Sequence, residues 1–324
     1  MDINQATNQK DRKMAQHWGD LVQEKTQQYG QLCVGIDPVL ADIPHAFKEG
    51  GKEPLEVLSN YVHFVLDTVS ADVGFIKPQS AFYEAFGSGG VAIMADLFAK
   101  AKSRGLGIIL DAKRGDIGST ADAYARAYLT PKSAGGSDLE VDCITINPFL
   151  GPETLEPFVE CAKKYGKGVF FLAKTSNPGA GWLQDQMIEG QTVSDRVSRL
   201  ISGWAEETKG QSGLSAVGAV VGITFPEDAR RLRQMMPNSI FLAPGLGPQG
   251  GNLEDVVALQ RPDGQGVVVP MSRGITMPED LHVSLEDYAD LISQRVQHIK
   301  LSLTAAAANT LKKDNGPEYG TPGL

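Results

Sequence analysis

Four charged residues follow an apolar run within the stretch "ILDAKRGDIGSTADAYA", residues 109–125. They are Asp111, Lys113, Arg114 and Asp116, and a run of small residues typical of a helix start comes after them. Removing an ion from water costs several kcal/mol unless the ion is paired. Acids and bases that alternate at the end of a buried strand therefore predict a cluster of ion pairs with a functional role.

The chemistry of such a cluster depends on its protonation. Lys77, in "FIKPQ", joins Asp111, Lys113 and Asp116, and two lysines with two aspartates keep one another ionised. A protonated lysine is not the neutral amine that a Schiff base needs. A fixed aspartate would repel an anionic substrate group and favour its loss as a neutral molecule, and a lysine could then protonate the carbanion. The cluster favours decarboxylation without a cofactor, and a purely structural salt-bridge network is the alternative.

Eight short apolar runs supply the elements that must position these residues. The runs cover residues 32–37, 73–79, 107–113, 143–149, 168–176, 216–224, 239–247 and 266–274. Helix-compatible segments fill most intervals, at 54–70, 89–105, 154–166, 193–210 and 226–236. Apolar strands that alternate with amphipathic helices indicate a parallel sheet covered by helices, and eight units predict a (β/α)8 TIM barrel. A doubly wound sheet is the alternative, but "GIDPVL" lacks its G-x-G-x-x-G turn.

The 324 residues are expected to form one barrel domain, residues 1–310, with a flexible Pro/Gly-rich tail at 311–324. A helix before about residue 31 is expected to close the barrel floor. The net charge of −9 and the absence of a Lys/Arg block argue against nucleic acid and anionic membranes as partners. The chain has neither an apolar run of about 18 residues nor the apolar core of a signal peptide, so a cytoplasmic protein is expected.

The three cysteines, Cys33, Cys143 and Cys161, are widely spaced, and two lie inside apolar runs. Buried thiols in a reducing compartment are therefore expected rather than a disulfide or a metal site.

Polar residues at the other strand ends predict a ligand site, because the active site of such a barrel lies at these ends. Asp37 ends the first run, Ser176 ends the fifth, and Asn177 follows it directly. The seventh run leads into "PGLGPQGG", which carries Gln249, and the eighth ends at Arg273. Glycines expose backbone N–H groups and arginine offers a bidentate fork, so the last two loops predict a phosphate site.

The sequence "DAKRGDIGST" resembles the signature D-x-K-x-x-D-I of the orotidine 5′-phosphate decarboxylases. The flanking "GIDP", "FIKPQ", "INPFLG", "KTSNPGA", "PGLGPQGG" and "SRGI" resemble the longer-chain bacterial group, type 2. The resemblance covers nearly every strand end in order, from about residue 15 to about residue 300. It implies conversion of orotidine 5′-monophosphate to UMP and CO2, the last step of de novo UMP biosynthesis, with no cofactor and no metal.

The resemblance also implies roles for the charged cluster. Lys113 donates a proton to C6 of the pyrimidine, Asp111 lies beside the substrate carboxylate, and Lys77 holds Asp111 and the ribose in register. Asp116 completes the tetrad by reaching into the neighbouring subunit's site of a homodimer. Thr120 accompanies Asp116 across that interface and contacts the ribose.

The remaining implied contacts bind the nucleotide. Asp37 binds a ribose hydroxyl, Ser176 reads the pyrimidine amide and Asn147 lies near the base, although "INPFLG" is also compatible with a simple turn. Gln249 and Arg273 hold the phosphate.

Three rival functions remain open on the sequence. A metal-dependent sugar-phosphate decarboxylase of the same fold usually has a further carboxylate ligand after the second strand, where this chain has "KPQ". A Schiff-base aldolase would form an adduct on Lys77 or Lys113. A non-catalytic nucleotide-binding barrel would have no use for an intact tetrad.

Overall fold

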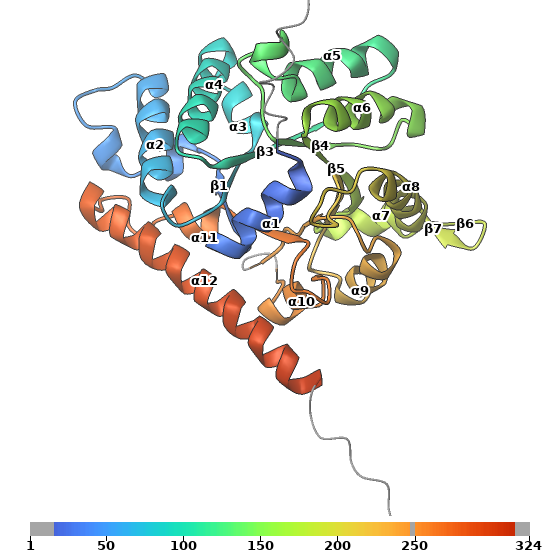
Figure 1. Cartoon of the computed structure of the whole chain (residues 1–324). Helices are drawn as coiled ribbons and strands as arrows, with labels where there is room; N and C mark the ends of the chain where they lie inside the picture. Colours follow the sequence, from blue (N-terminus) through green and yellow to red (C-terminus); the bar gives the residue numbers. More distant parts are fainter. Residues whose placement is uncertain (1–15, 247–249, 315–324) are drawn as a thin grey trace, which may run out of the picture.

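The computed structural model describes residues 16–246 and 250–314 and contains a closed barrel of parallel strands (Figure 1). The order around the barrel is β1-β10-β9-β8-β5-β4-β3-β2. The barrel strands are β1 Leu32–Ile36, β2 Phe75–Pro78, β3 Gly107–Arg114, β4 Cys143–Ile146, β5 Gly168–Lys174, β8 Val217–Val221, β9 Phe241–Leu242 and β10 Val267–Met271. Each lies within one of the eight apolar runs except β3, which extends one residue further, so the predicted (β/α)8 barrel is confirmed.

Helices surround the strands and follow them in alternation (Figure 1). They are α1 Trp18–Tyr29, α2 Pro54–Val69, α3 Ser80–Glu84, α4 Gly87–Ser103, α5 Gly118–Leu129, α6 Glu156–Tyr165, α7 Gly181–Gln184, α8 Val193–Glu207, α9 Pro226–Met235, α10 Leu253–Val257, α11 Arg273–Thr276 and α12 Leu285–Asp314. All five predicted helical segments are confirmed. Across the described ranges, none of these helices is long and apolar enough to cross a membrane.

The inside of the barrel is a packed apolar core closed by α1. All eight barrel strands contribute a side chain to one buried cluster, among them Phe75, Ile109 and Phe170, and Trp18 of α1 belongs to it. The indole of Trp18 is fully buried and meets the rings of Phe75 and Phe170 edge-on. A Cβ atom on Gly168 would lie 2.5 Å from this indole, so glycine is needed there. The expected helix at the barrel floor is therefore confirmed.

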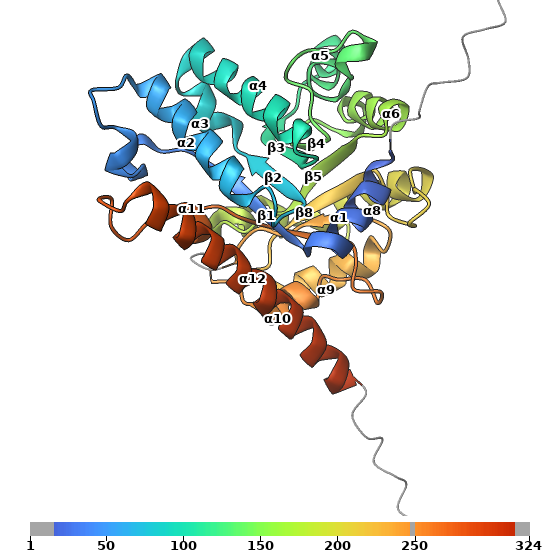
Figure 2. The same cartoon turned by 60° about the vertical axis from the view of Figure 1, so that its left-hand side comes forward.

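The C-terminal helix α12 lies across the outside of the barrel, beside α2 and α10 (Figure 2). Tyr288 and Ile292 anchor it because both side chains are fully buried. The helix continues to Asp314, so the expected end of the domain at residue 310 falls inside α12. Residues 311–314 of the expected flexible tail belong to this helix, and the rest of it, from 315 onward, lies outside the described residues.

The cysteines are free thiols, as expected. Cys33 and Cys143 are buried and Cys161 is half-buried. Burial raises the pKa of Cys33 to about 12, so this thiol is protonated and unreactive at neutral pH.

Candidate active site

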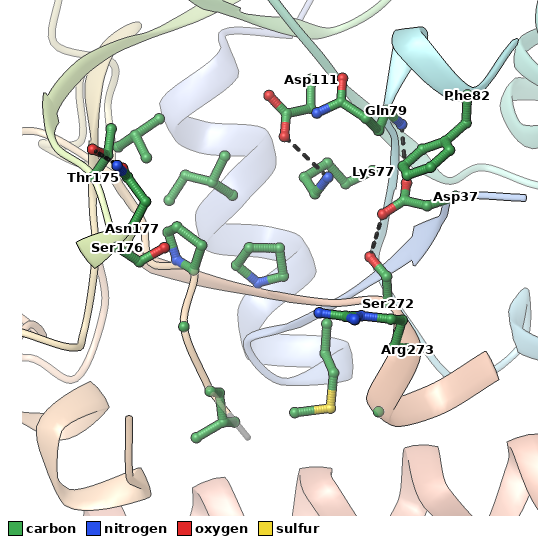
Figure 3. Close-up of a pocket in the computed structure, with 18 of the residues that line it drawn as sticks. Asp37, Lys77, Gln79, Phe82, Asp111, Thr175, Ser176, Asn177, Ser272 and Arg273 are labelled. Carbon is green, nitrogen blue, oxygen red and sulfur yellow. Dashed lines mark hydrogen bonds and ion pairs between the residues drawn. The ribbon is translucent and has the colours of Figure 1, made fainter. Parts of the chain in front are cut away.

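A cavity of about 790 Å³ opens at the C-terminal ends of the strands (Figure 3). The apolar side chains of Leu172, Val220 and Leu242 line it from the barrel interior. Seven of the residues predicted from the sequence line the same cavity, namely Asp37, Lys77, Asp111, Lys113, Ser176, Asn177 and Arg273. These seven come from β2, from β3 and from the segments that follow β1, β5 and β10, so the fold gathers residues that are up to 236 positions apart, from 37 to 273.

Asp111 is the centre of the charged cluster. Its Oδ2 accepts a hydrogen bond from Lys77 Nζ at 3.2 Å, and its Oδ1 accepts one from Lys113 Nζ at 2.6 Å. Thr145 Oγ1 donates to the same Oδ1 at 2.9 Å. The side chains of Asp111 and Lys77 are nearly buried, whereas that of Lys113 is 43% exposed. Lys113 is therefore the cation of this cluster that a ligand in the cavity can reach.

The backbone of Lys113 is unusual for a residue at the end of a strand. Its φ is +48°, in the left-handed region, and the pairing of β3 with β4 shifts register between Leu110 and Arg114. A non-glycine residue in this region costs about 1–2 kcal/mol. Such strain persists only where neighbouring contacts fix it, and it gathers at functional sites.

The two innermost charges of the cluster stabilise each other. Burial favours the neutral form of Asp111, but Lys77, Lys113 and the hydrogen bonds to Lys113 and Thr145 outweigh it and lower the pKa of the carboxyl to about 2. Burial also disfavours the charge on Lys77, but the carboxylates of Asp37 and Asp111 raise the pKa of this lysine above its ordinary value. Asp111 is therefore a carboxylate and Lys77 an ammonium ion at neutral pH.

Asp37 follows β1, the neighbour of β2, and lies on the same side of the cavity as Lys77 and Gln79 (Figure 3). Its Oδ1 accepts a hydrogen bond from the backbone N–H of Gln79 at 3.1 Å, and its Oδ2 accepts one from Ser272 Oγ at 2.5 Å. The carboxylate is half-buried and fixed from two neighbouring strand ends, so it presents oriented oxygen atoms to the cavity.

The loop after β5 faces Asp37 and Arg273 across the cavity, with Ser176 and Asn177 at its start (Figure 3). Gln184 of α7 folds this loop back, because its side-chain amide bonds the backbone N–H and the hydroxyl of Thr175 at 2.9 Å and 2.8 Å. The Nζ of Lys174, at the end of β5, is fully buried and pairs with Asp185, directly after α7, and with Asp228 of α9. These contacts attach the loop to the barrel.

Arg273 is the first residue of α11, and its exposed guanidinium points into the cavity (Figure 3). Among the residues that the structure describes, no carboxylate pairs with it. Gly274, the next residue, and Gly245 also line the cavity. An unpaired guanidinium next to accessible backbone is suited to an anion. Gln249, the other predicted phosphate ligand, lies outside the described residues.

Three predicted residues do not line the cavity of their own chain. Asp116 accepts a hydrogen bond from the backbone N–H of Ile117, and Thr120 is exposed on α5. Asn147 is exposed, and its Oδ1 accepts from the backbone N–H of Phe149 at 3.1 Å, which is the geometry of a turn. The expected contact of Asn147 with the base therefore gains no support from its position.

The comparison with protein families is decisive. Residues 30–288 match the family described as "Orotidine 5'-phosphate decarboxylase / HUMPS", a span that holds well over half of the chain. The chain belongs to this family. Every predicted site residue lies inside the matched span, Asp116, Thr120 and Asn147 included.

Individual members of the orotidine 5′-phosphate decarboxylase family cover most of the chain. The orotidine 5′-phosphate decarboxylase of Rhodopirellula baltica is 42% identical over 248 residues, which are 75% of this chain and 82% of the relative. That of Caldicellulosiruptor bescii is 37% identical over 288 residues, 85% of this chain and 93% of the relative. The crystal structure of a Streptomyces avermitilis protein assigned as this decarboxylase superposes with a TM-score of 0.77 at 33% identity, covering 93% of this chain and 100% of the other.

Sequence reasoning missed several side chains that build this family member's site. Thr145, Gln79 and Ser272 bond the two aspartates, and Lys174 and Gln184 hold the loop after β5. Gln79, Lys174 and Ser272 stand within the quoted strand-end motifs "FIKPQ", "KTSNPGA" and "SRGI", and Thr145 stands within the apolar run 143–149. The sequence prediction relied on neighbouring residues that carry a charge or to which the family resemblance gives a role. The position of Gln79, Lys174 and Ser272 at the ends of predicted strands is the feature that could have identified them.

The Asp111→Asn variant is expected to lose stability less steeply than the wild type as the pH falls. The pKa of Asp111 is about 2 in the folded chain, below the unfolded value of about 3.9. Ionised Asp111 therefore stabilises the fold above about pH 4, and this contribution disappears as the pH falls toward the folded pKa. Urea unfolding of both proteins between about pH 6 and about pH 3 measures the two slopes, and equal slopes would contradict the expectation.

Proposed function

We propose that this chain decarboxylates orotidine 5′-monophosphate to UMP and CO2, the last step of UMP biosynthesis, without a cofactor. The observation that carries the proposal is the Lys77–Asp111–Lys113 cluster inside the cavity of a chain that belongs to this family. We also propose a cytoplasmic location for the reaction.

Lys113 acts as the proton donor. The substrate carboxylate lies beside Asp111, whose negative charge disfavours it and favours its departure as neutral CO2. The bond between C6 and the carboxylate carbon breaks and its electron pair stays on C6. Lys113 then transfers a proton from Nζ to C6 and recovers one from solvent, to which its side chain is 43% exposed.

The energetic contribution of Lys113 exceeds that of Asp111. The carbanion at C6 gains little resonance stabilisation, so the barrier to be lowered lies near the upper end of the roughly 8–23 kcal/mol that enzymes supply. One repelling carboxylate cannot supply that amount, and destabilisation of the bound substrate is a contested explanation. A lysine already oriented by Asp111 stabilises the developing negative charge without reorganising during the reaction.

The other cavity residues bind the nucleotide. Ser176 contacts the pyrimidine amide from the loop after β5, and Asp37 accepts a hydrogen bond from a ribose hydroxyl. Arg273 holds the phosphate together with Gln249. Binding of the phosphate, remote from C6, supplies energy that closes the loops over the reacting part of the substrate.

We further propose a homodimer in which Asp116 and Thr120 enter the partner's cavity. Neither residue lines its own cavity. Three apolar side chains on the neighbouring loops after β3 and β4 are exposed, Ile117 by 62%, Phe149 by 72% and Leu150 by 46%. We call these three the β3–β4 apolar patch. Exposed apolar groups beside polar residues fit an interface, and a second copy would cover the patch on both subunits.

The direct test mixes the pure protein with orotidine 5′-monophosphate in excess EDTA and follows the loss of orotate-ring absorbance. Turnover is expected to be unaffected by the chelator, because the proposed chemistry uses a lysine and no metal. Turnover that needs an added divalent cation supports the sugar-phosphate decarboxylase instead. Borohydride trapping on Lys77 or Lys113 supports the aldolase, and tight UMP binding without turnover supports the binding protein.

Replacing Arg273 with alanine is expected to weaken recognition of the phosphate. Loss of two charge-assisted hydrogen bonds, about 1.5–3 kcal/mol each, predicts a fall in kcat/KM for orotidine 5′-monophosphate of at least about a hundredfold. Unphosphorylated orotidine should show almost no loss. Arg104→Ala, which removes an exposed guanidinium paired with Asp67 on the outer helices, is the matched control. Equal losses on both substrates would show that Arg273 does not contact the phosphate.

A further inference from the structure

The pairing of β3 with β4 is interrupted directly beneath the charged cluster. Leu110 pairs with Ile144, and the next pairing joins Arg114 to Ile146. The three intervening residues of β3 therefore lie opposite one residue of β4, Thr145. A bulge of this kind leaves backbone N–H groups outside the regular ladder, and buried N–H groups need other partners.

The hydroxyl of Thr145 supplies those partners. Its Oγ1 accepts hydrogen bonds from the backbone N–H groups of Ala112 at 3.1 Å and Lys113 at 2.9 Å. The same hydroxyl donates to Asp111 Oδ1 at 2.9 Å. A hydroxyl has one hydrogen to donate and two acceptor sites, so the bonding capacity of Thr145 is fully used. The residue is fully buried, which leaves no place for water to replace it.

These bonds connect the backbone of the proton donor to the carboxylate beside it. Lys113 has a φ of +48°, which is a strained conformation for a non-glycine residue. The hydrogen bond from its own backbone N–H to Thr145 Oγ1 helps to hold this conformation. Both oxygens of Asp111 are also fixed, Oδ2 by Lys77 and Oδ1 by Lys113 and Thr145. Without the hydroxyl of Thr145, the side-chain contacts that hold the carboxylate among the described residues would come from Lys77 and Lys113 alone.

We infer that Thr145 is a positioning residue for the decarboxylation. It holds the bulge that directs Lys113 toward the cavity and sets the orientation of the Asp111 carboxylate. The inference rests on the proposed function, since it assigns Lys113 the proton transfer and Asp111 the place beside the substrate carboxylate. Thr145 touches neither the substrate nor the reacting atoms, and it acts through these two residues.

Two substitutions at this position separate positioning from packing. Thr145→Val keeps the shape of the side chain and removes the hydroxyl, whereas Thr145→Ser keeps the hydroxyl and removes the methyl group. The valine variant is expected to lose at least about tenfold in kcat, because small errors in the placement of reacting groups are costly. Its KM and its affinity for UMP should stay within about threefold of the wild type. The serine variant should keep kcat within about threefold.

Thr208 offers a matched control. It is also buried, its Oγ1 bonds Trp204 O at 2.8 Å and Ser215 Oγ at 2.7 Å, and it lies at the other end of the barrel, before β8. Thr208→Val removes a buried hydroxyl that has two hydrogen-bond partners. It therefore reproduces the loss of stability expected from removing a buried hydroxyl, without changing any contact of β3. It is expected to lower stability and leave kcat unchanged.

The outcomes are distinct. A fall in kcat for Thr145→Val, with rescue by serine and no fall for Thr208→Val, supports the inference. Equal kcat values for Thr145→Val and wild type, or a serine variant as impaired as the valine variant, overturn it. If the valine variant does not fold, Thr145→Cys replaces it, because a thiol is close to a hydroxyl in size but is a weak hydrogen-bond donor. Equal kcat values for the cysteine and serine variants then overturn the inference. A wild type without turnover contradicts the proposed function itself.

Discussion

Replacing Lys113 with alanine is expected to abolish turnover and to change nucleotide binding little. Lys113 is the exposed cation of the cluster, and its Nζ lies 2.6 Å from Asp111 Oδ1. Its charge is needed mainly as negative charge develops on C6, so the loss should fall on kcat. The affinity for UMP, which has no carboxylate to lose, should remain close to that of the wild type.

Stopped-flow or steady-state absorbance gives kcat, and equilibrium titration gives the affinity for UMP. Lys100→Ala is a matched control, because the Lys100 side chain is also 43% exposed and is paired with Asp96 on α4, away from the cavity. Its kcat should equal that of the wild type. A Lys113→Ala variant that keeps more than about a tenth of wild-type kcat, a difference of roughly 1.4 kcal/mol, would falsify the proton-donor role.

The barrel could be predicted because its signals are local and repeated. The strand segment "GVVVPM" is apolar throughout, since a parallel strand is buried on both faces, and β10 is buried at every position. The small hairpin of β6 Met187–Ile188 and β7 Gln191–Thr192 was not predicted. Its strands have two residues each and carry no periodicity.

The site was predictable only in part, for a different reason. Lys77, Asp111 and Lys113 stand out because charges at the end of an apolar strand need partners. Thr145 does not stand out in the sequence, because threonine is common in strands. Its hydrogen bonds to Ala112 and Lys113 depend on a bulge in the neighbouring strand, β3, which the sequence does not reveal. Ser272 does not stand out in the sequence either, because its hydrogen bond to Asp37 joins residues that are 235 positions apart.

The last expected result concerns Asp116, which should act in the cavity of the partner subunit. Asp116 lies beyond the end of β3, does not line its own cavity, and stands beside the β3–β4 apolar patch. If it crosses a two-fold interface, Lys113→Ala and Asp116→Ala damage different sites of a mixed dimer. One site then carries both substitutions and the other carries neither. Each variant alone should be nearly inactive.

Unfolding the two variants together in equal amounts and refolding them tests this arrangement. With random pairing half of the dimers are mixed, and one of their two sites is intact, so about a quarter of wild-type activity should return. A mixture of Lys113→Ala with Lys77→Ala is the control, because both residues serve their own barrel and every site stays damaged. Native mass spectrometry counts the mixed dimers. If these form and no activity returns, Asp116 serves its own barrel or none, whereas the decarboxylase assignment, which depends on Lys113 and the family match, is unaffected.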